Sequence, residues 1–157
     1  CGAFLNLTGR ENLISRCIEW GLPKSEVNRV LAAVGLENAA DASVKQYSLG
    51  MKRRLDIGTA LLGNPQLLIM DEPINGLDPV GVIEVRDLLL SLKDRRDKTV
   101  LISSHNLDEL EKVATSFAFL HQGRLLVKEE NSYKDRSLEK RFLDLIGEAD
   151  NATSATD

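Results

Sequence analysis

Two adjacent carboxylates, Asp71 and Glu72, directly follow the apolar run Leu67 to Met70. A short unbroken apolar run predicts a buried strand of a parallel sheet, and open sheets of that kind bind ligands at the carboxyl ends of their strands. There, one carboxylate can hold a magnesium ion through water while its neighbour polarises an attacking water, as phosphoryl transfer to water requires. The alternative is that these acids only cap the next turn or stay solvated.

Two more polar residues are predicted at the same edge. Pro73 and the pair Asn75-Gly76 predict a turn after the acids, and Asp78 then begins a helix at Pro79. His105 follows a second apolar run, Thr99 to Ser103, and an imidazole at that strand end could donate to a phosphate. A histidine satisfied locally at a helix start is the alternative interpretation.

A helix N-terminus with small residues is predicted upstream, at Tyr47-Ser48-Leu49-Gly50-Met51. Free amides, the positive end of the helix dipole and the Ser48 hydroxyl could together bind an anion, and Gly50 would let the backbone approach it closely. Most helix N-termini bind only water, so this segment alone does not indicate an anion site.

The chain reads as an α/β protein. A capping box at Thr8 and Glu11 predicts a helix to about Trp20, and Pro23 is expected in the first turn of a second helix capped by Gly35. The later elements are predicted in this order: a helix from Ser48 to about Leu62, a strand Leu67 to Met70, a helix Pro79 to about Arg95, a strand Thr99 to Ser103, a helix Asn106 to Val113, strands Ser116 to Leu120 and Arg124 to Val127, and a helix Ser137 to Ile146.

We therefore expect a partial helical subdomain at residues 1–46, the main α/β part at residues 47–147 and a disordered polar tail at residues 148–157. The net charge of −4 gives no footprint for a nucleic-acid partner, and no apolar run reaches the roughly 18 residues of a membrane span, so no direct membrane insertion is expected. Two cysteines and no zinc-type spacing favour a reducing compartment.

In chain order, these segments resemble the signature, Walker B, D-loop and H-loop motifs of ABC ATPases. The resemblance rests on four segments: Tyr47 to Arg54, Leu67 to Pro73, Asn75 to Pro79, and Ser103 to His105. It extends to about Ile146 and is closest to export subunits of the bacitracin and lantibiotic type. It implies a partial P-loop NTPase fold, with a parallel β-sheet core, flanking helices and a helical subdomain.

The family resemblance also implies roles for single residues. Two such domains sandwich two ATP molecules, and the signature of one, here Ser48, Gly50 and Met51, touches the terminal phosphate held by the other. By the same likeness Asp71 holds Mg²⁺ through water and Glu72 is the catalytic base. His105 steadies the terminal phosphate, and Asp78 communicates across the dimer.

The implied function is that of an ATP-hydrolysing subunit that powers export, such as antimicrobial-peptide or drug efflux or immunity, with ATP and Mg²⁺ as cofactors. The implied partners are a transmembrane permease and a second ABC ATPase domain, identical or different. The protein would then lie on the cytoplasmic face of the plasma membrane, held there through the permease.

The sequence departs from the common family pattern at Leu49, Met51 and Ile74, where glycine, glutamine and threonine are frequent. It also contains no Gly-Lys pair, and so no phosphate-cradling loop of the form Gly-x-x-x-x-Gly-Lys. With Cys1 in place of a methionine, we expect an N-terminally truncated chain that does not hydrolyse ATP alone and leaves apolar sheet surface uncovered.

Two other functions stay open: a soluble ABC-type ATPase that acts on the ribosome, and a non-enzymatic remnant that pairs with an intact cassette. DNA-maintenance ATPases of the superfamily are disfavoured, because they insert long coiled coils before the signature and no heptad run of that length occurs here. Sequence upstream of Cys1 would discriminate among the open functions.

Overall fold

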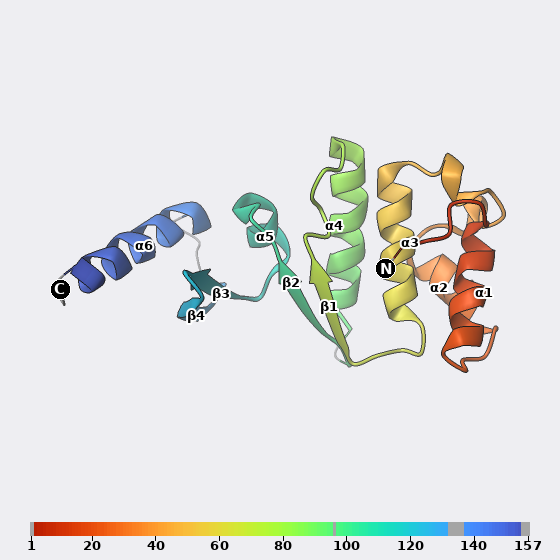
Figure 1. The fold of residues 1–157 in the computed structure, drawn as a ribbon, viewed down its shortest axis with the longest axis horizontal. Coiled ribbons are helices and arrows are strands. Elements are labelled where there is room, and N and C mark those ends of the chain that lie inside the picture. The colour runs from red at the N-terminus through yellow and green to blue at the C-terminus, as the bar shows by residue number, and fades with distance from the viewer. Residues whose placement is uncertain (1, 96, 132–136, 155–157) are drawn as a thin grey trace. The chain divides into compact units, whose positions relative to one another are not determined.

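The computed structural model describes residues 2–95, 97–131 and 137–154 (Figure 1). The contacts between residues divide the chain into two compact units, Cys1–Ser104 and His105–Asp157. The first unit consists mainly of helices and also contains a short parallel sheet. The second unit combines a hairpin with two helices.

The first helix, α1 (Gly9–Glu19), begins at the predicted capping box. The Thr8 hydroxyl accepts a hydrogen bond from the Glu11 amide (3.1 Å), and the Glu11 carboxylate accepts one from the Thr8 amide (2.8 Å). The second helix, α2 (Glu26–Ala33), starts later than predicted. Pro23 lies in the turn before the helix, where its carbonyl accepts a hydrogen bond from the Glu26 amide (3.1 Å). Ser25 is the residue that directly precedes the first helical residue.

Two 3-10 turns, η1 (Glu37–Ala39) and η2 (Val44–Gln46), lead into α3 (Leu49–Leu61). Helix α3 packs against both α1 and α2. The contacts divide the chain after Ser104, and the expected boundary after residue 46 stays a prediction. The side chains with the least exposure in this helical core include Leu13, Cys17, Val30, Leu31, Leu55 and Leu61.

The predicted β-α-β unit is present as β1 (Leu67–Asp71), α4 (Pro79–Lys93) and β2 (Thr99–Ser103). The two strands are parallel and pair in register from Leu67 with Thr99 to Asp71 with Ser103. The strands were expected to be buried, but only alternate side chains of β1 are: Leu68 and Met70 are buried, whereas Ile69 is 70% exposed. Helix α4 contacts β2 and α3, and the face that carries Ile69 is left open.

The second unit contains α5 (Leu107–Val113), β3 (Ser116–His121), β4 (Arg124–Glu130) and α6 (Leu138–Ser154). The antiparallel strands meet at Gln122-Gly123, both with positive φ (48° and 76°), as a two-residue hairpin turn requires. The core of this unit consists of Phe117, Phe119, Leu138 and Leu145, with Leu110, Val127 and Phe142 packed against it.

Helix α6 is longer than predicted. It continues past Ile146 to Ser154, so residues 148–154 of the expected disordered tail are helical. The helix-favouring residues Glu148 and Ala149 explain the continuation, and residues 155–157 lie outside the described part of the chain. Within the described part, no helix is both long enough and apolar enough to cross a membrane.

Candidate functional site

The acid pair lies at the carboxyl edge of the parallel sheet, as predicted. Asp71 is the last residue of β1 and pairs in register with Ser103, the last residue of β2. The Ser103 hydroxyl donates a hydrogen bond to Oδ1 of Asp71, and the Glu72 amide donates to the Ser103 carbonyl (3.0 Å). Asp71 is exposed. It therefore presents a carboxylate with one oxygen fixed by a neighbouring strand.

The backbone turns sharply at Glu72. Its φ of 46° lies in the left-handed region, which non-glycine residues seldom adopt. The Asn75 amide donates to the Glu72 carbonyl (3.3 Å), and Gly76 follows with a φ of 74°. This turn leads the chain from β1 into α4.

Ile74, a departure from the family pattern, lies inside this turn with 7% of its surface exposed. Its apolar side chain is thus part of the core rather than a lining of the exposed edge. The structure accounts for an apolar residue at this position through burial.

Asp78 begins α4, as predicted. Its Oδ1 accepts a hydrogen bond from the Gly81 amide (3.0 Å), and Pro79 occupies the first turn, where its missing amide hydrogen is not needed. One carboxylate oxygen of Asp78 is thus engaged within its own helix.

The Ser48 segment forms the N-terminus of α3. Oγ of Ser48 accepts a hydrogen bond from the Met51 amide (3.1 Å), and Leu49 is 54% exposed. Gly50 is buried against α4. A Cβ atom at this position would lie only 3.3 Å from the Cα of Gly81. Glycine at position 50 therefore permits the close crossing of α3 and α4.

Figure 1 shows that α3 and α4 begin at the same end of the first unit, the end toward which β1 points. The crossing at Gly50 and Gly81 joins these two helix starts directly. The structure therefore brings Ser48 to Met51 close to the start of α4 at Asp78, and it places Asp71 and Glu72 at the sheet edge on that side.

His105 is the first residue of the second unit. Its predicted place beside Asp71 and Glu72 is therefore still a prediction. Within its own unit, His105 lines a shallow open hollow with Asn106, Leu107, Asp108 and Glu139. Asn106 caps α5, where its side-chain oxygen accepts from the Glu109 amide (3.1 Å).

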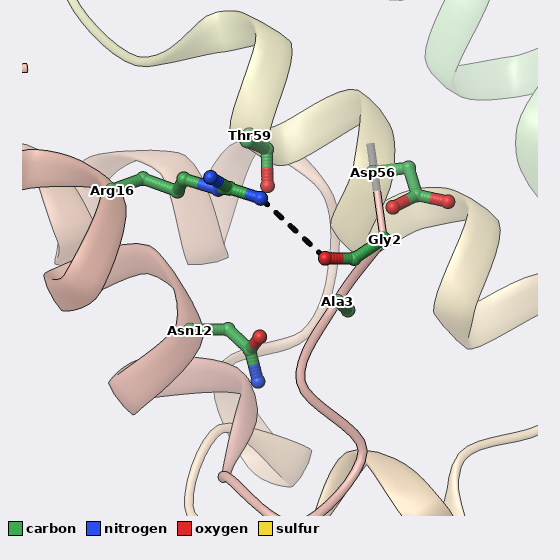
Figure 2. Close-up of a pocket in the computed structure, with 6 residues that line it drawn as sticks. All are labelled: Gly2, Ala3, Asn12, Arg16, Asp56 and Thr59. Atoms are coloured by element: carbon green, nitrogen blue, oxygen red, sulfur yellow. Dashed lines mark hydrogen bonds between the residues drawn. The ribbon is translucent and has the colours of Figure 1, made fainter. Parts of the chain in front are cut away.

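Figure 2 shows a second, much smaller gap between the N-terminal segment, α1 and α3. Its volume is about 10 Å³, roughly the space of one water molecule. The Asn12 side chain closes one side by bonding the amide and the carbonyl of Phe4 (2.7 and 3.0 Å), and Arg16 donates to the Gly2 carbonyl (3.4 Å). No predicted site residue lines this gap, and a nucleotide could not enter it.

Ser103 and Gly81 contribute to the site but were not among the predicted site residues. Ser103 has a sequence signal, because it ends the second apolar run directly before Ser104-His105. Gly81 has none, since its role depends on the crossing with α3. No group of three or more His, Cys, Asp or Glu side chains in the described part of the chain could hold a metal ion. The exposed Asp71 carboxylate fits a magnesium ion held through water, which needs only one or two carboxylates.

The chain resembles known proteins along most of its length. A family model described as "ABC transporter" matches residues 2–75. A bacitracin transport ATP-binding protein of Bacillus licheniformis is 46% identical over 126 residues, covering 80% of this chain and 41% of that protein. A lantibiotic transport ATP-binding protein of Streptococcus pyogenes is 40% identical over 127 residues, covering 81% of this chain and 55% of that protein.

A solved structure described as the ATP binding subunit of an ABC transporter matches with a TM-score of 0.73 and 28% identity. The match covers 92% of this chain and 65% of that structure. The chain spans about half the length of the curated relatives it matches. The expected partial P-loop NTPase fold is confirmed by this likeness.

Proposed function

Because this chain belongs to the family of ABC transporter ATP-binding proteins, we propose that it forms the signature-to-H-loop part of an ATP-hydrolysing subunit that powers export. The single observation that supports this best is the edge of the first unit. There, an acid pair at a parallel strand end lies on the side where two capped helices begin. The named bacitracin and lantibiotic relatives make peptide export or immunity the favoured process.

Asp71 and Glu72 would have different roles at the sheet edge. ATP and Mg²⁺, when bound, would supply the phosphoryl group and the cation that neutralises its charge. Asp71, with one oxygen fixed by Ser103, would hold that cation through water, and Glu72 would polarise the attacking water as general base. His105 would donate to the terminal phosphate.

The α3 N-terminus would act on a nucleotide held by a second ABC ATPase domain. Ser48, Gly50 and Met51 belong to the first turn, where backbone amides and the helix dipole favour an anion. Asp78, at the neighbouring helix start, would communicate across that dimer. A transmembrane permease would hold the assembly at the cytoplasmic face of the membrane.

The test joins this chain to the upstream part of the Bacillus licheniformis relative, which would supply a phosphate-binding loop. We expect the joined protein to bind ATP and hydrolyse it with Mg²⁺, whereas the 157-residue chain alone has no turnover because it contains no Gly-Lys pair. Glu72→Gln should keep ATP binding and lower kcat roughly 10² to 10⁴-fold, as loss of a general base does.

Glu37→Gln is the matched control, since Glu37 is an exposed glutamate outside the site, and its kcat should not change. Turnover by the 157-residue chain alone would contradict the need for an upstream loop. Normal turnover by Glu72→Gln would remove Glu72 from the chemistry.

A further inference from the structure

We propose that Arg54 is a positioning residue that fixes the first turns of α3, and with them Ser48 and Gly50, relative to both α2 and α4. The inference rests on the proposed function, because it concerns the segment that would face the nucleotide. Arg54 follows Ser48 by six positions and ends the segment that resembles the signature motif, where the sequence alone does not separate its role from that of Lys52 and Arg53.

The first contact of Arg54 reaches α4. Its Nη2 lies 3.2 Å from Oε2 of Glu84, one turn beyond Gly81. The same Glu84 oxygen lies beside the glycine crossing, 3.7 Å from where a side-chain atom at Gly50 would sit. The ion pair and the glycine crossing therefore hold α3 against α4 at adjacent points.

The second contact reaches the C-terminus of α2. Nη1 of Arg54 donates to the carbonyl oxygens of Val34 (3.2 Å) and Gly35 (3.0 Å). Carbonyls at a helix C-terminus lack partners within the helix and carry the negative end of its dipole, so a cation there is favoured. Gly35 has a φ of 64°, and a Cβ atom there would lie 3.0 Å from the same Nη1.

The guanidinium is well suited to this position, because its planar fork carries separate donors for α2 and α4. The side chain is only 14% exposed, and its buried Nε has no hydrogen-bond partner among the described residues, so the two terminal nitrogens make the contacts. A lysine has one ammonium and cannot reach both sets of acceptors from one place. A displacement of α2 would thus be passed to the starts of α3 and α4.

The test replaces Arg54 by Lys in the joined protein described above. We expect kcat to fall on the order of tenfold, because a misplacement of about 1 Å in a catalytic arrangement can cost up to 10²-fold. The Kd for ATP at the upstream loop should not change, since Arg54 would act on the neighbouring domain's nucleotide. In the 157-residue chain, amide hydrogen exchange of residues 49–55 should become faster in Arg54→Lys.

Arg124→Lys, at an exposed arginine on β4 outside the site, is the control, with neither kcat nor the exchange of residues 49–55 expected to change. Glu84→Gln provides a milder variant that keeps the size of the side chain and should lower kcat severalfold. The double variant should lose less than the product of the two single losses, because both changes remove the same contact.

Each result bears on a separate statement. Unchanged kcat in Arg54→Lys, or exchange that rises equally across the whole first unit, would overturn the positioning role. A loss of kcat in the double variant that equals the product of the two single losses would contradict action through Glu84. No turnover in the unsubstituted joined protein would contradict the proposed function, and the exchange comparison would still decide whether Arg54 fixes α3.

Discussion

A hydroxyl on the adjacent strand constrains the carboxylate of Asp71. Ser103 pairs in register with Asp71 and donates a hydrogen bond to Oδ1 of its carboxylate. Glu72 has a left-handed backbone and is partly buried, with its Oε2 enclosed, whereas Asp71 is exposed. Single backbone and side-chain contacts therefore give two neighbouring acids different surroundings.

Asp56 on α3 provides a prediction at this scale. Burial raises the pKa of Asp56 above its ordinary value, and Arg53 partly opposes the shift. The folded state therefore binds the proton more tightly than the unfolded state, so the charged form costs stability at neutral pH. Asp56→Asn should raise the free energy of unfolding at pH 7 by less than about 1 kcal/mol, because the group is only half-buried.

This gain should shrink as the pH falls and vanish below about pH 4, where Asp56 is protonated in both states. Thermal unfolding from pH 3.5 to 7 measures it, with the exposed Asp144→Asn as control. A gain that grows toward acid pH would contradict the direction of the pKa shift.

At the scale of elements, glycines and helix caps set how α3 and α4 meet. A Cβ atom at Gly81 would lie 2.8 Å from Oδ1 of Asp78, the oxygen that caps α4, and 3.6 Å from the Cα of Gly50. The cap and the crossing therefore share the same small space. An added methyl group must displace one of them.

We expect Gly81→Ala to lower the free energy of unfolding by about 1 kcal/mol, the typical cost of a lost N-cap. Urea unfolding followed by circular dichroism measures it. Gly147→Ala on α6 is the control, because nothing lies within 4 Å of a Cβ there and alanine favours the helix. Equal or greater stability of Gly81→Ala would mean that the crossing relaxes freely.

Residue types close together in the sequence predicted where most of the helices begin. The helix starts at Thr8, Ser48 and Asp78 were predicted, because the residues that begin a helix act on amides only two or three positions away. The roles of Arg54 and Glu84 were missed, because their contacts join elements far apart in the sequence. Sequence alone shows that such residues are charged, and it does not show which partners burial gives them.

At the scale of the whole molecule, the first unit has an exposed apolar sheet face, although its strands were predicted as buried from their apolar runs. Leu67, Ile69 and Leu101 are 53%, 70% and 58% exposed. Apolar runs predict strands well, but they do not say whether a layer covers each face. The expected uncovered apolar surface is therefore present.

This face should bind an apolar fluorescent dye such as ANS. Replacing Ile69 and Leu101 together by threonine should lower the dye fluorescence clearly, with a stability change of about 0.5 kcal/mol or less per site, because threonine keeps the strand preference and neither side chain is buried. Leu143→Gln, at an exposed leucine on α6, serves as control. Unchanged fluorescence in the double variant would place the dye elsewhere.

The Ser48 hydroxyl acts as a hydrogen-bond acceptor in the cap of α3. Its oxygen receives the Met51 amide hydrogen, so the hydrogen of the hydroxyl itself is not used by the cap. A serine can serve the helix as an acceptor and an anion as a donor at once. Aspartate would cap the helix equally well, yet it would offer a negative charge where serine offers a hydrogen. Exchanging Ser48 for aspartate would therefore keep the helix cap while removing the donor that the proposed function requires.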